Sequence, residues 1–428
     1  LPGSGLQGQV EDGTLNVSSG RGSASAGPGI VSGVKVLSDK VPDVSSLEAW
    51  QRSFIRDGMS DREKALAVWK TVWMFQHQDA PPSEYVHPQS TVYDAIKLFN
   101  VYGYSHCDVG ASHVEALARE ISLPARGWSL RGHVVPEVSY GGAWHLLDSS
   151  LINYFPKADG ELASVDEIRD AVVSWFDRNP GLKGDDEKLR AFHREDGWSG
   201  WKRGPELLTR SPGFDAMGWY AAKTHGWYSA MREYDGEGGT PFQWDPGYAQ
   251  GYRVNIQLRK GERLTRNWFN KGLHIGMKEG HAPYALAGVV GKDSLAYSAD
   301  AGDLAPGRVG NGTLEYEVPL ADGSFRGGAL EARNLACRAE DGAAPALHVK
   351  DPAQDGVLIL RMPCPYVYLT GEIGLDAAVG PGGSISVSFS DNHGQTWRPI
   401  ATLRSNGRQK TDFSALAFNR YDYRLRFV

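Results

Sequence analysis

The sequence predicts an α+β domain followed by an all-β sandwich domain, and three observations support this fold class. An amphipathic helix begins after Ser60, because Ser60-Asp-Arg-Glu63 has the spacing of a capping box. A second helical period begins at Cys107 and is followed by two apolar runs around Gly141-Gly142, which is a hairpin signal. After Tyr252 the chain consists of short alternating or apolar runs separated by Gly, Asp and Pro, as in β-sandwiches.

Cys107 begins the second helical period, and a histidine and an aspartate follow on the two runs of the hairpin. A thiol attacks as the thiolate, which a helix N-terminus and a neighbouring imidazolium both favour. His133 and Asp148 flank Gly141-Gly142, so antiparallel pairing would bring them within side-chain reach. Asp148 would then hold one nitrogen of His133 while the other faces the sulfur. This order predicts a nucleophilic-cysteine enzyme in which Cys107, His133 and Asp148 are catalytic.

His145 is the alternative candidate for the base. Side chains alternate between the two faces of a strand, so Trp144, Leu146 and Asp148 share one face and His145 points to the other. If Asp148 faces the site, His145 points away from it. We therefore favour His133 as the base.

Several segments between residues 101 and 150 resemble motifs of the transglutaminase-like superfamily, which includes the peptide:N-glycanase relatives. Cys107 matches its cysteine at a helix start. Ser122-Leu-Pro-Ala-Arg126 is similar to its Gly-[Ile/Leu]-Pro-Ala-Arg segment, with Ser in place of Gly. His133-Val-Val-Pro-Glu-Val138 resembles its His-Ala-Trp-x-Glu-Val strand, without the Trp. Trp144 to Ser150 resembles its Trp-x-x-Leu-Asp-Pro-[Ser/Thr] strand, with Ser149 in place of Pro.

This resemblance implies a transglutaminase-like (papain-like) catalytic domain, in which the helix of the cysteine packs on an antiparallel sheet. It also implies acyl transfer or amide hydrolysis through Cys107. The backbone N–H of Cys107 would supply one oxyanion donor, and the superfamily implies a second donor upstream. The superfamily includes proteases, amidases and cross-linking enzymes, so the resemblance leaves the substrate open.

The chain divides by composition into three segments. Residues 1–28 are rich in Gly and Ser and are expected to be a flexible leader. Residues 29–250 are expected to form the catalytic domain with a helical, aromatic-rich extension, and residues 251–428 the β-sandwich. The sequence begins without Met and without an apolar signal core, as a processed exported protein or a trimmed chain would. A secreted or periplasmic location is the expectation.

The composition of the chain limits which kinds of binding partner are expected. At 428 residues the chain is too long for one ordinary core. The net charge of −6 is spread without a basic stripe, so nucleic acid is not an expected partner. No run approaches 18 apolar residues, so no membrane span is expected. The 13 Trp and 18 Tyr either fill cores or form carbohydrate-stacking surfaces.

Aromatic segments supply the candidate substrate contacts. Tyr104 belongs to the aromatic loop before Cys107, and Thr224-His225-Gly-Trp227-Tyr is a second aromatic loop. Loops of this kind line substrate clefts, although they also cover cores. We take Tyr104, His225, Trp227 and Arg232 as candidate substrate-binding residues.

The C-terminal half contains two further features. Ser390-Asp-Asn-His-Gly-Gln-Thr-Trp397 resembles the Asp-box hairpin of sialidases, a structural turn in which Asn392 caps backbone N–H groups and Gly394 takes a positive φ. Cys337 and Cys364 either form a disulfide or remain two buried thiols.

The functional prediction is a cysteine-dependent hydrolase or acyl transferase acting on amide bonds of peptides or glycopeptides. No His-x-x-x-His, Cys-x-x-Cys or acidic calcium-loop spacing is present, so no metal and no cofactor are expected. Two alternatives stay open: a carbohydrate-active enzyme on the same scaffold that acts on polysaccharide, and a non-catalytic glycan- or protein-binding module. The sequence leaves the oligomeric state undetermined.

Overall fold

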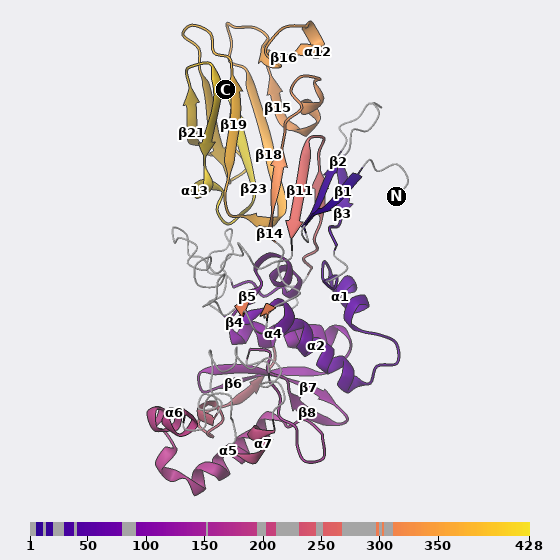
Figure 1. Ribbon diagram of the computed structural model, residues 1–428, viewed down its shortest axis with the longest axis vertical. Helices are drawn as coiled ribbons and strands as arrows, with labels where there is room; N and C mark the ends of the chain where they lie inside the picture. The colour runs from indigo at the N-terminus through magenta and orange to yellow at the C-terminus, as the bar shows by residue number, and fades with distance from the viewer. Residues whose placement is uncertain are drawn as a thin grey trace.

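A four-stranded antiparallel sheet organises the first half of the chain, and the last third forms a second set of β-sheets (Figure 1). The computed structural model describes residues 6–11, 14–19, 30–37, 41–78, 91–150, 153–194, 203–210, 231–244, 251–267, 297–298, 302–303 and 311–428. The architecture is mixed α+β with a β-rich C-terminal region, as the sequence predicted.

The first sheet has the strand order β8-β7-β6-β9. Its strands are β6 (Ala125–Leu130), β7 (His133–Tyr140), β8 (Ala143–Leu146) and β9 (Thr240–Phe242). The helices of this half are α1 (Leu47–Phe54), α2 (Asp61–Phe75), α3 (Ala95–Lys97), the π-helical η1 (Leu98–Tyr102), α4 (Cys107–Glu120), α5 (Val165–Arg178), the 3-10 helix η2 (Pro180–Leu182), α6 (Asp186–Arg194) and α7 (Glu206–Thr209). The short β4 (His77–Gln78) and β5 (Tyr104–Ser105) pair in parallel just before α4.

Helices cover both faces of this sheet, and each face has its own core (Figure 1). On one face, Val68 of α2 and Val114 of α4 pack with Val138 of β7. On the other face, Ile168 of α5 packs with Val135 of β7. Alternate side chains of β7 therefore pack into two different cores, and the sheet is buried on both sides.

Local sequence signals account for where α2 begins and where β7 turns into β8. The capping box at α2 is confirmed: the Ser60 hydroxyl accepts from the Glu63 N–H at 3.3 Å, and the Glu63 carboxylate accepts from the Ser60 N–H at 2.7 Å. The Gly-Gly hairpin is also confirmed, because Tyr140 pairs with Ala143 and the two glycines between them have φ of 59° and 81°. Positive φ at both central residues is what a two-residue hairpin turn requires.

The C-terminal region is built on a five-stranded sheet of order β15-β18-β23-β20-β21. Its elements are the 3-10 helix η4 (Ser324–Gly328), β15 (Ala329–Arg333), β16 (Leu335–Cys337), α12 (Arg338–Asp341), β17 (Leu347–Val349), β18 (Val357–Tyr368), β19 (Glu372–Ala377), β20 (Ile385–Ser390), β21 (Arg398–Leu403), β22 (Gly407–Asp412), α13 (Ser414–Ala417) and β23 (Arg420–Phe427). The β19–β22 pair packs on the larger sheet through Ala377, Val387 and Leu403.

The predicted Asp-box turn connects β20 to β21. The Asn392 side-chain oxygen accepts from the Thr396 N–H at 3.0 Å, and Gly394 has φ of 86°. The Ser390 hydroxyl accepts from the Gly394 N–H at 2.9 Å, which adds a second side-chain cap. This turn is confirmed as a structural element of a hairpin.

The N-terminal segment differs from the expected leader between residues 6 and 19. Strands β1 (Leu6–Glu11) and β2 (Thr14–Ser19) form a hairpin, and β2 pairs with β11 (Glu262–Asn267), which in turn pairs with β14 (Asn311–Tyr316). The signal was present in the sequence, because Asp12-Gly13 separates two alternating runs. The high content of Gly and Ser obscured it. The described residues also include the short pair β12 (Tyr297–Ser298) and β13 (Gly302–Asp303).

The two halves of the molecule are joined by strand pairing and by side chains. Strand β3 (Val31–Val34) pairs with β10 (Ile256–Leu258), so a strand from before the first helices pairs with one from after the first sheet. At the other contact, the hydroxyls of Tyr102 and Tyr421 lie 2.7 Å apart. Tyr102 ends η1, so the β-rich region contacts the element that leads into α4.

Candidate functional site

Cys107 is the first residue of α4, as the sequence predicted. Gly103 ends η1 with φ of 76°, which turns the chain from that helix toward β5 and α4. The preceding residue, His106, has extended backbone and acts as the N-cap without a side-chain bond. The thiol is half-buried. Cys107 therefore lies where backbone N–H groups at a helix start favour negative charge.

His133 begins β7, directly after the turn from β6, and is 2% exposed. Its Nε2 lies 2.8 Å from the Asp148 Oδ2. Two contacts fix Asp148: its Oδ1 accepts from the Ser150 N–H at 2.8 Å, and its backbone carbonyl accepts from the Trp69 indole N–H at 2.8 Å. Asp148 is thus fixed in position, and its carboxylate is hydrogen-bonded to one ring nitrogen of His133.

Burial and the surrounding ionisable groups act on the pKa of His133 in opposite directions. Burial is the largest effect and lowers the pKa of His133, but the charges of Asp148 and Glu233, the hydrogen bond to Asp148 and the Cys107 thiol together raise the pKa well above its ordinary value. The arrangement therefore favours the imidazolium. A thiol next to an imidazolium at a helix start can ionise and attack an electrophilic carbon.

His145 has a different environment, as the alternation of side chains along the strand predicted. Its ring stacks on Tyr140 with centroids 3.7 Å apart. Its Nδ1 lies 2.7 Å from the carbonyl oxygen of Leu162, and its Nε2 lies 3.2 Å from that of Tyr140. Both ring nitrogens face backbone carbonyls, so His145 is a structural residue of the hairpin.

The four candidate substrate-binding residues differ in how much of each the structure describes. The backbone of Tyr104 pairs with His77 in the β4–β5 ladder, but its side chain is outside the described part of the structure. His225 and Trp227 lie outside the described residues. Arg232 is placed, and its Nη1 lies 3.0 Å from Asp186 of α6, so its guanidinium is engaged in an ion pair.

The sequence interpretation missed two groups near the site. Glu233 is 2% exposed and its charge acts on His133. Tyr93 and Trp244 are half-buried, with ring centroids 5.0 Å apart, and the Tyr93 hydroxyl lies 3.4 Å from the carboxylate of Asp108, the residue after Cys107. Since Tyr93 and Trp244 are far apart in sequence, no local motif could have joined them.

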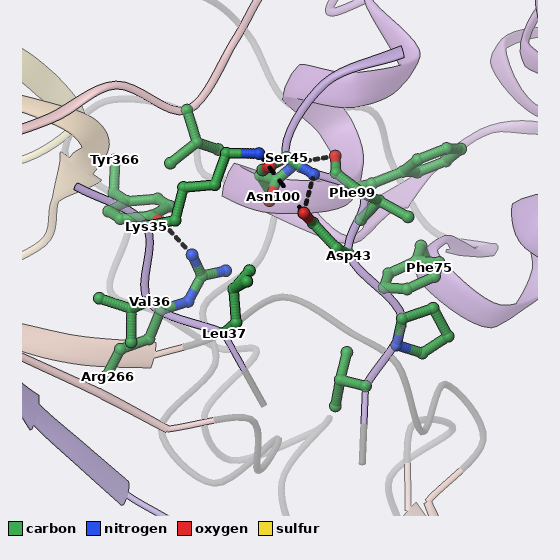
Figure 2. Close-up of a pocket in the computed structure, with 14 residues that line it drawn as sticks. Lys35, Val36, Leu37, Asp43, Ser45, Phe75, Phe99, Asn100, Arg266 and Tyr366 are labelled. Carbon is green, nitrogen blue, oxygen red and sulfur yellow. Dashed lines mark hydrogen bonds and ion pairs between the residues drawn. The ribbon is translucent and has the colours of Figure 1, made fainter. Parts of the chain in front are cut away.

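A small cavity of about 30 Å³ lies at the junction of the two halves (Figure 2), and none of the three candidate catalytic residues lines it. Phe75 and Phe99 line it from the first half, and Arg266 and Tyr366 from the second; the guanidinium of Arg266 donates to the Tyr366 hydroxyl. At this volume it has room for very little beyond water.

Cys337 and Cys364 are free thiols. Burial raises the pKa of the Cys364 thiol to about 12, so it is protonated at neutral pH. Within the described ranges, no three His, Cys, Asp or Glu side chains are grouped so that they could bind a metal ion. Nor is any helix in those ranges long and apolar enough to cross a membrane.

Comparison with known proteins gives one partial likeness. No protein-family profile matches the chain, and no solved structure matches it. An acireductone dioxygenase from Frankia alni is 31% identical over an alignment of 123 residues, and the alignment covers 27% of this chain and 57% of that protein. The matched part thus spans little more than half of that relative.

Proposed function

We propose that this chain is a cysteine-dependent hydrolase or acyl transferase that acts on amide bonds of peptides or glycopeptides. The observation that supports it most is the hydrogen bond of His133 to Asp148, together with the Cys107 thiol at a helix start among the groups that act on His133. We also propose a transglutaminase-like fold for residues 29–250 and a β-sandwich for residues 251–428. A secreted or periplasmic location stays a prediction.

In the proposed acylation, the proton of the Cys107 thiol already resides on His133 as the imidazolium, and the thiolate sulfur attacks the amide carbonyl carbon. The oxygen becomes negative, and in this proposal the Cys107 backbone N–H donates to it. His133 then returns the proton to the departing nitrogen as the C–N bond breaks. The products are a free amine and a thioester on Cys107.

In the second step, water or an amine attacks the thioester. His133 takes the proton of the nucleophile, and the C–S bond breaks to release a carboxylic acid or a new amide. This restores the thiolate of Cys107 and the imidazolium of His133. Asp148 keeps the ring oriented through both steps because its carboxylate remains hydrogen-bonded to Nε2.

The test is amide cleavage by the wild-type chain and by the Cys107→Ala variant, on a library of peptides, isopeptides and glycopeptides. We expect turnover by the wild type and a loss of at least 10³-fold in the variant. The Cys337→Ala variant is the control, since Cys337 is buried elsewhere. Equal turnover by the wild type and Cys107→Ala, or none with any substrate, would count against the proposal, and the second outcome would favour a binding module.

A glycan-directed substrate is the second candidate, and the ring pair of Tyr93 and Trp244 favours it. Half-buried aromatic faces beside a carboxylate suit the apolar face and hydroxyls of a sugar ring. Trp244→Ala should reduce activity on glycopeptides or polysaccharides but not on the matching bare peptides. The backbone of Trp244 would keep its contacts with Glu115 and Arg119 in this variant. Equal losses on both substrate classes would exclude a glycan-specific role.

A further inference from the structure

The five-stranded C-terminal sheet carries two parallel columns of polar side chains on the face opposite its core. Residues that pair across neighbouring strands share a face, and so do alternate residues of one strand. Arg426 of β23 pairs with Ser388 of β20, and Arg424 pairs with Ser390. Leu425, between the two arginines, is buried in the core on the other face. The outward face therefore has a column of arginines beside a column of serines.

A third arginine on this face adds to the positive charge. Arg361 of β18 pairs directly with Arg424, and like charges directly opposite each other on a sheet are destabilising. The Asp422 carboxylate accepts from Nε and Nη2 of Arg361 at 2.8 Å and 2.6 Å, which offsets one of the charges. An anion bound across the guanidinium groups would remove the remaining cost.

The indole of Trp397 borders the arginine column. The guanidinium of Arg426 lies 4.4 Å from the centre of the Trp397 ring, and that of Arg424 donates to the carbonyl oxygen of His393. A Cβ added to Gly394 would lie 3.2 Å from Nη1 of Arg424 and 3.3 Å from Cζ2 of Trp397, so the turn brings the two side chains together. An indole and a carbonyl are neutral, so neither contact cancels a positive charge.

These polar groups are accessible and have complementary partners in an acidic sugar. The side chain of Arg361 is 50% exposed, and Arg424, Arg426, Ser386 and Ser388 are half-buried. Guanidinium groups bind carboxylates through two parallel hydrogen bonds, serine hydroxyls both donate and accept, and an indole supplies a flat apolar surface. A sugar ring with a carboxylate presents the anion, the hydroxyls and an apolar ring face together, whereas an acidic peptide presents mainly the anion.

We propose that this outward face binds an acidic polysaccharide whose sugars carry carboxylates. Its residues, which we call the arginine–serine face, are Arg361, Arg424, Arg426, Ser386, Ser388 and Trp397. The net charge of the whole chain is −6, so the attraction for a polyanion is local to this face. The inference goes beyond the proposed amide chemistry, because it involves none of the three candidate catalytic residues.

The experiment measures binding of the full chain to polygalacturonate by isothermal titration calorimetry at low ionic strength. We expect the wild type to bind this polymer and not its fully methyl-esterified form, in which the carboxylates are neutral. The double variant Arg424→Gln/Arg426→Gln should bind about tenfold more weakly or worse. The control Arg338→Gln/Arg408→Gln makes the same change in net charge at exposed arginines outside the five-stranded sheet, and it should bind like the wild type.

If circular dichroism shows that the double variant is unfolded, Ser388→Asp replaces it. This change puts a carboxylate opposite Arg426, where it competes with the polymer, so binding should again weaken. Unchanged affinity in a folded variant of the face, or no binding of polygalacturonate by the wild type, would overturn the inference. Equally tight binding of poly-L-glutamate or of single-stranded DNA would also overturn it, because the face would then recognise charge alone.

The outcome is independent of the test of the proposed function, since calorimetry needs no amide cleavage. A chain that binds polygalacturonate through this face but cleaves no amide would refute the proposed function alone. A chain that cleaves amides through Cys107 but does not bind the polymer would refute the inference alone.

Discussion

His133 and His145 lie on paired strands, yet only His133 is surrounded by ionisable side chains. The ring of His145 is enclosed by Tyr140 and two backbone carbonyls, so it has no access to the thiol. Strand alternation was sufficient to choose His133 over His145 from the sequence alone. Side chains on one strand alternate between its two faces, so His145 points away from the face of Asp148. The charge of Glu233 could not be anticipated, since it comes from a distant segment.

This contrast predicts a matched pair of variants. His133→Asn should slow alkylation of Cys107 by iodoacetamide at pH 6.5 at least tenfold, because the thiolate loses its cationic partner. His145→Asn should leave the rate unchanged at temperatures where the variant is folded. Mass spectrometry of the modified peptide measures both rates. Equal rates in the two variants would mean that His133 does not act on Cys107.

Glu115 of α4 supplies a pH-dependent prediction for stability. Its side chain is fully buried, and burial raises its pKa to about 7, although Arg119 lies 3.2 Å away. An unfolded chain loses this proton near pH 4.5, whereas the folded chain retains it until about pH 7. The folded state binds more protons in that window, so the stability contributed by protonated Glu115 is lost as the pH rises through it.

Glu115→Gln should abolish this loss, since the amide stays neutral. The variant should gain stability relative to the wild type between pH 5 and pH 8, by on the order of 2–3 kcal/mol. Urea unfolding of the wild type and the variant at pH 5 and at pH 8 measures this gain in the free energy of unfolding. The exposed Glu120 on the same helix is the control, and Glu120→Gln should show no such change. A difference between wild type and Glu115→Gln that does not vary with pH would contradict the prediction.

At the scale of elements, the β7–β8 hairpin brings His133 within reach of Asp148. Its two-residue turn depends on Gly141 and Gly142, and a Cβ at either would meet nothing within 4 Å. The reason for glycine here is therefore the positive φ alone. The turn is a local signal, and so it could be predicted.

Gly142→Ala should lower the free energy of unfolding by about 1 kcal/mol, because alanine is strained in the left-handed region. Gly181→Ala is the control: Gly181 also has open space around it but has no positive φ. Denaturant unfolding compares the two. A loss of stability in Gly181→Ala as large as that in Gly142→Ala would show that conformation is not the cause.

Local sequence rules predicted where individual helices begin better than they predicted which strands pair in a sheet. The helix starts at Ser60 and Cys107 follow from capping and periodicity. The addition of β9 to the first sheet does not, because Thr240–Phe242 is a short run far from β6 in sequence. The same holds for the surroundings of the site. The order Cys107, His133, Asp148 was visible, whereas Glu233, Tyr93 and Trp244 depend on long-range packing.

Across the whole molecule, part of the contact between the halves is polar and aromatic. Tyr102 and Tyr421 meet through their hydroxyls, and the ammonium of Lys97 lies 4.6 Å from the centre of the Tyr421 ring. We expect a double-mutant cycle of Tyr102→Phe and Tyr421→Phe to show a coupling of about 1 kcal/mol in the free energy of unfolding. Strict additivity of the two single changes would show that the hydroxyls do not interact in solution.

The pairing of β3 with β10 has a consequence for where this chain can be truncated. A gene fragment ending at residue 250 would encode β3 without its neighbour, and would lose the Val254 N–H that binds the Ser45 carbonyl and the Tyr252 N–H that binds Asp94. Residues 252–258 therefore belong structurally to the first half as well as to the second. A truncated chain that is to keep β3 paired has to extend at least to Leu258.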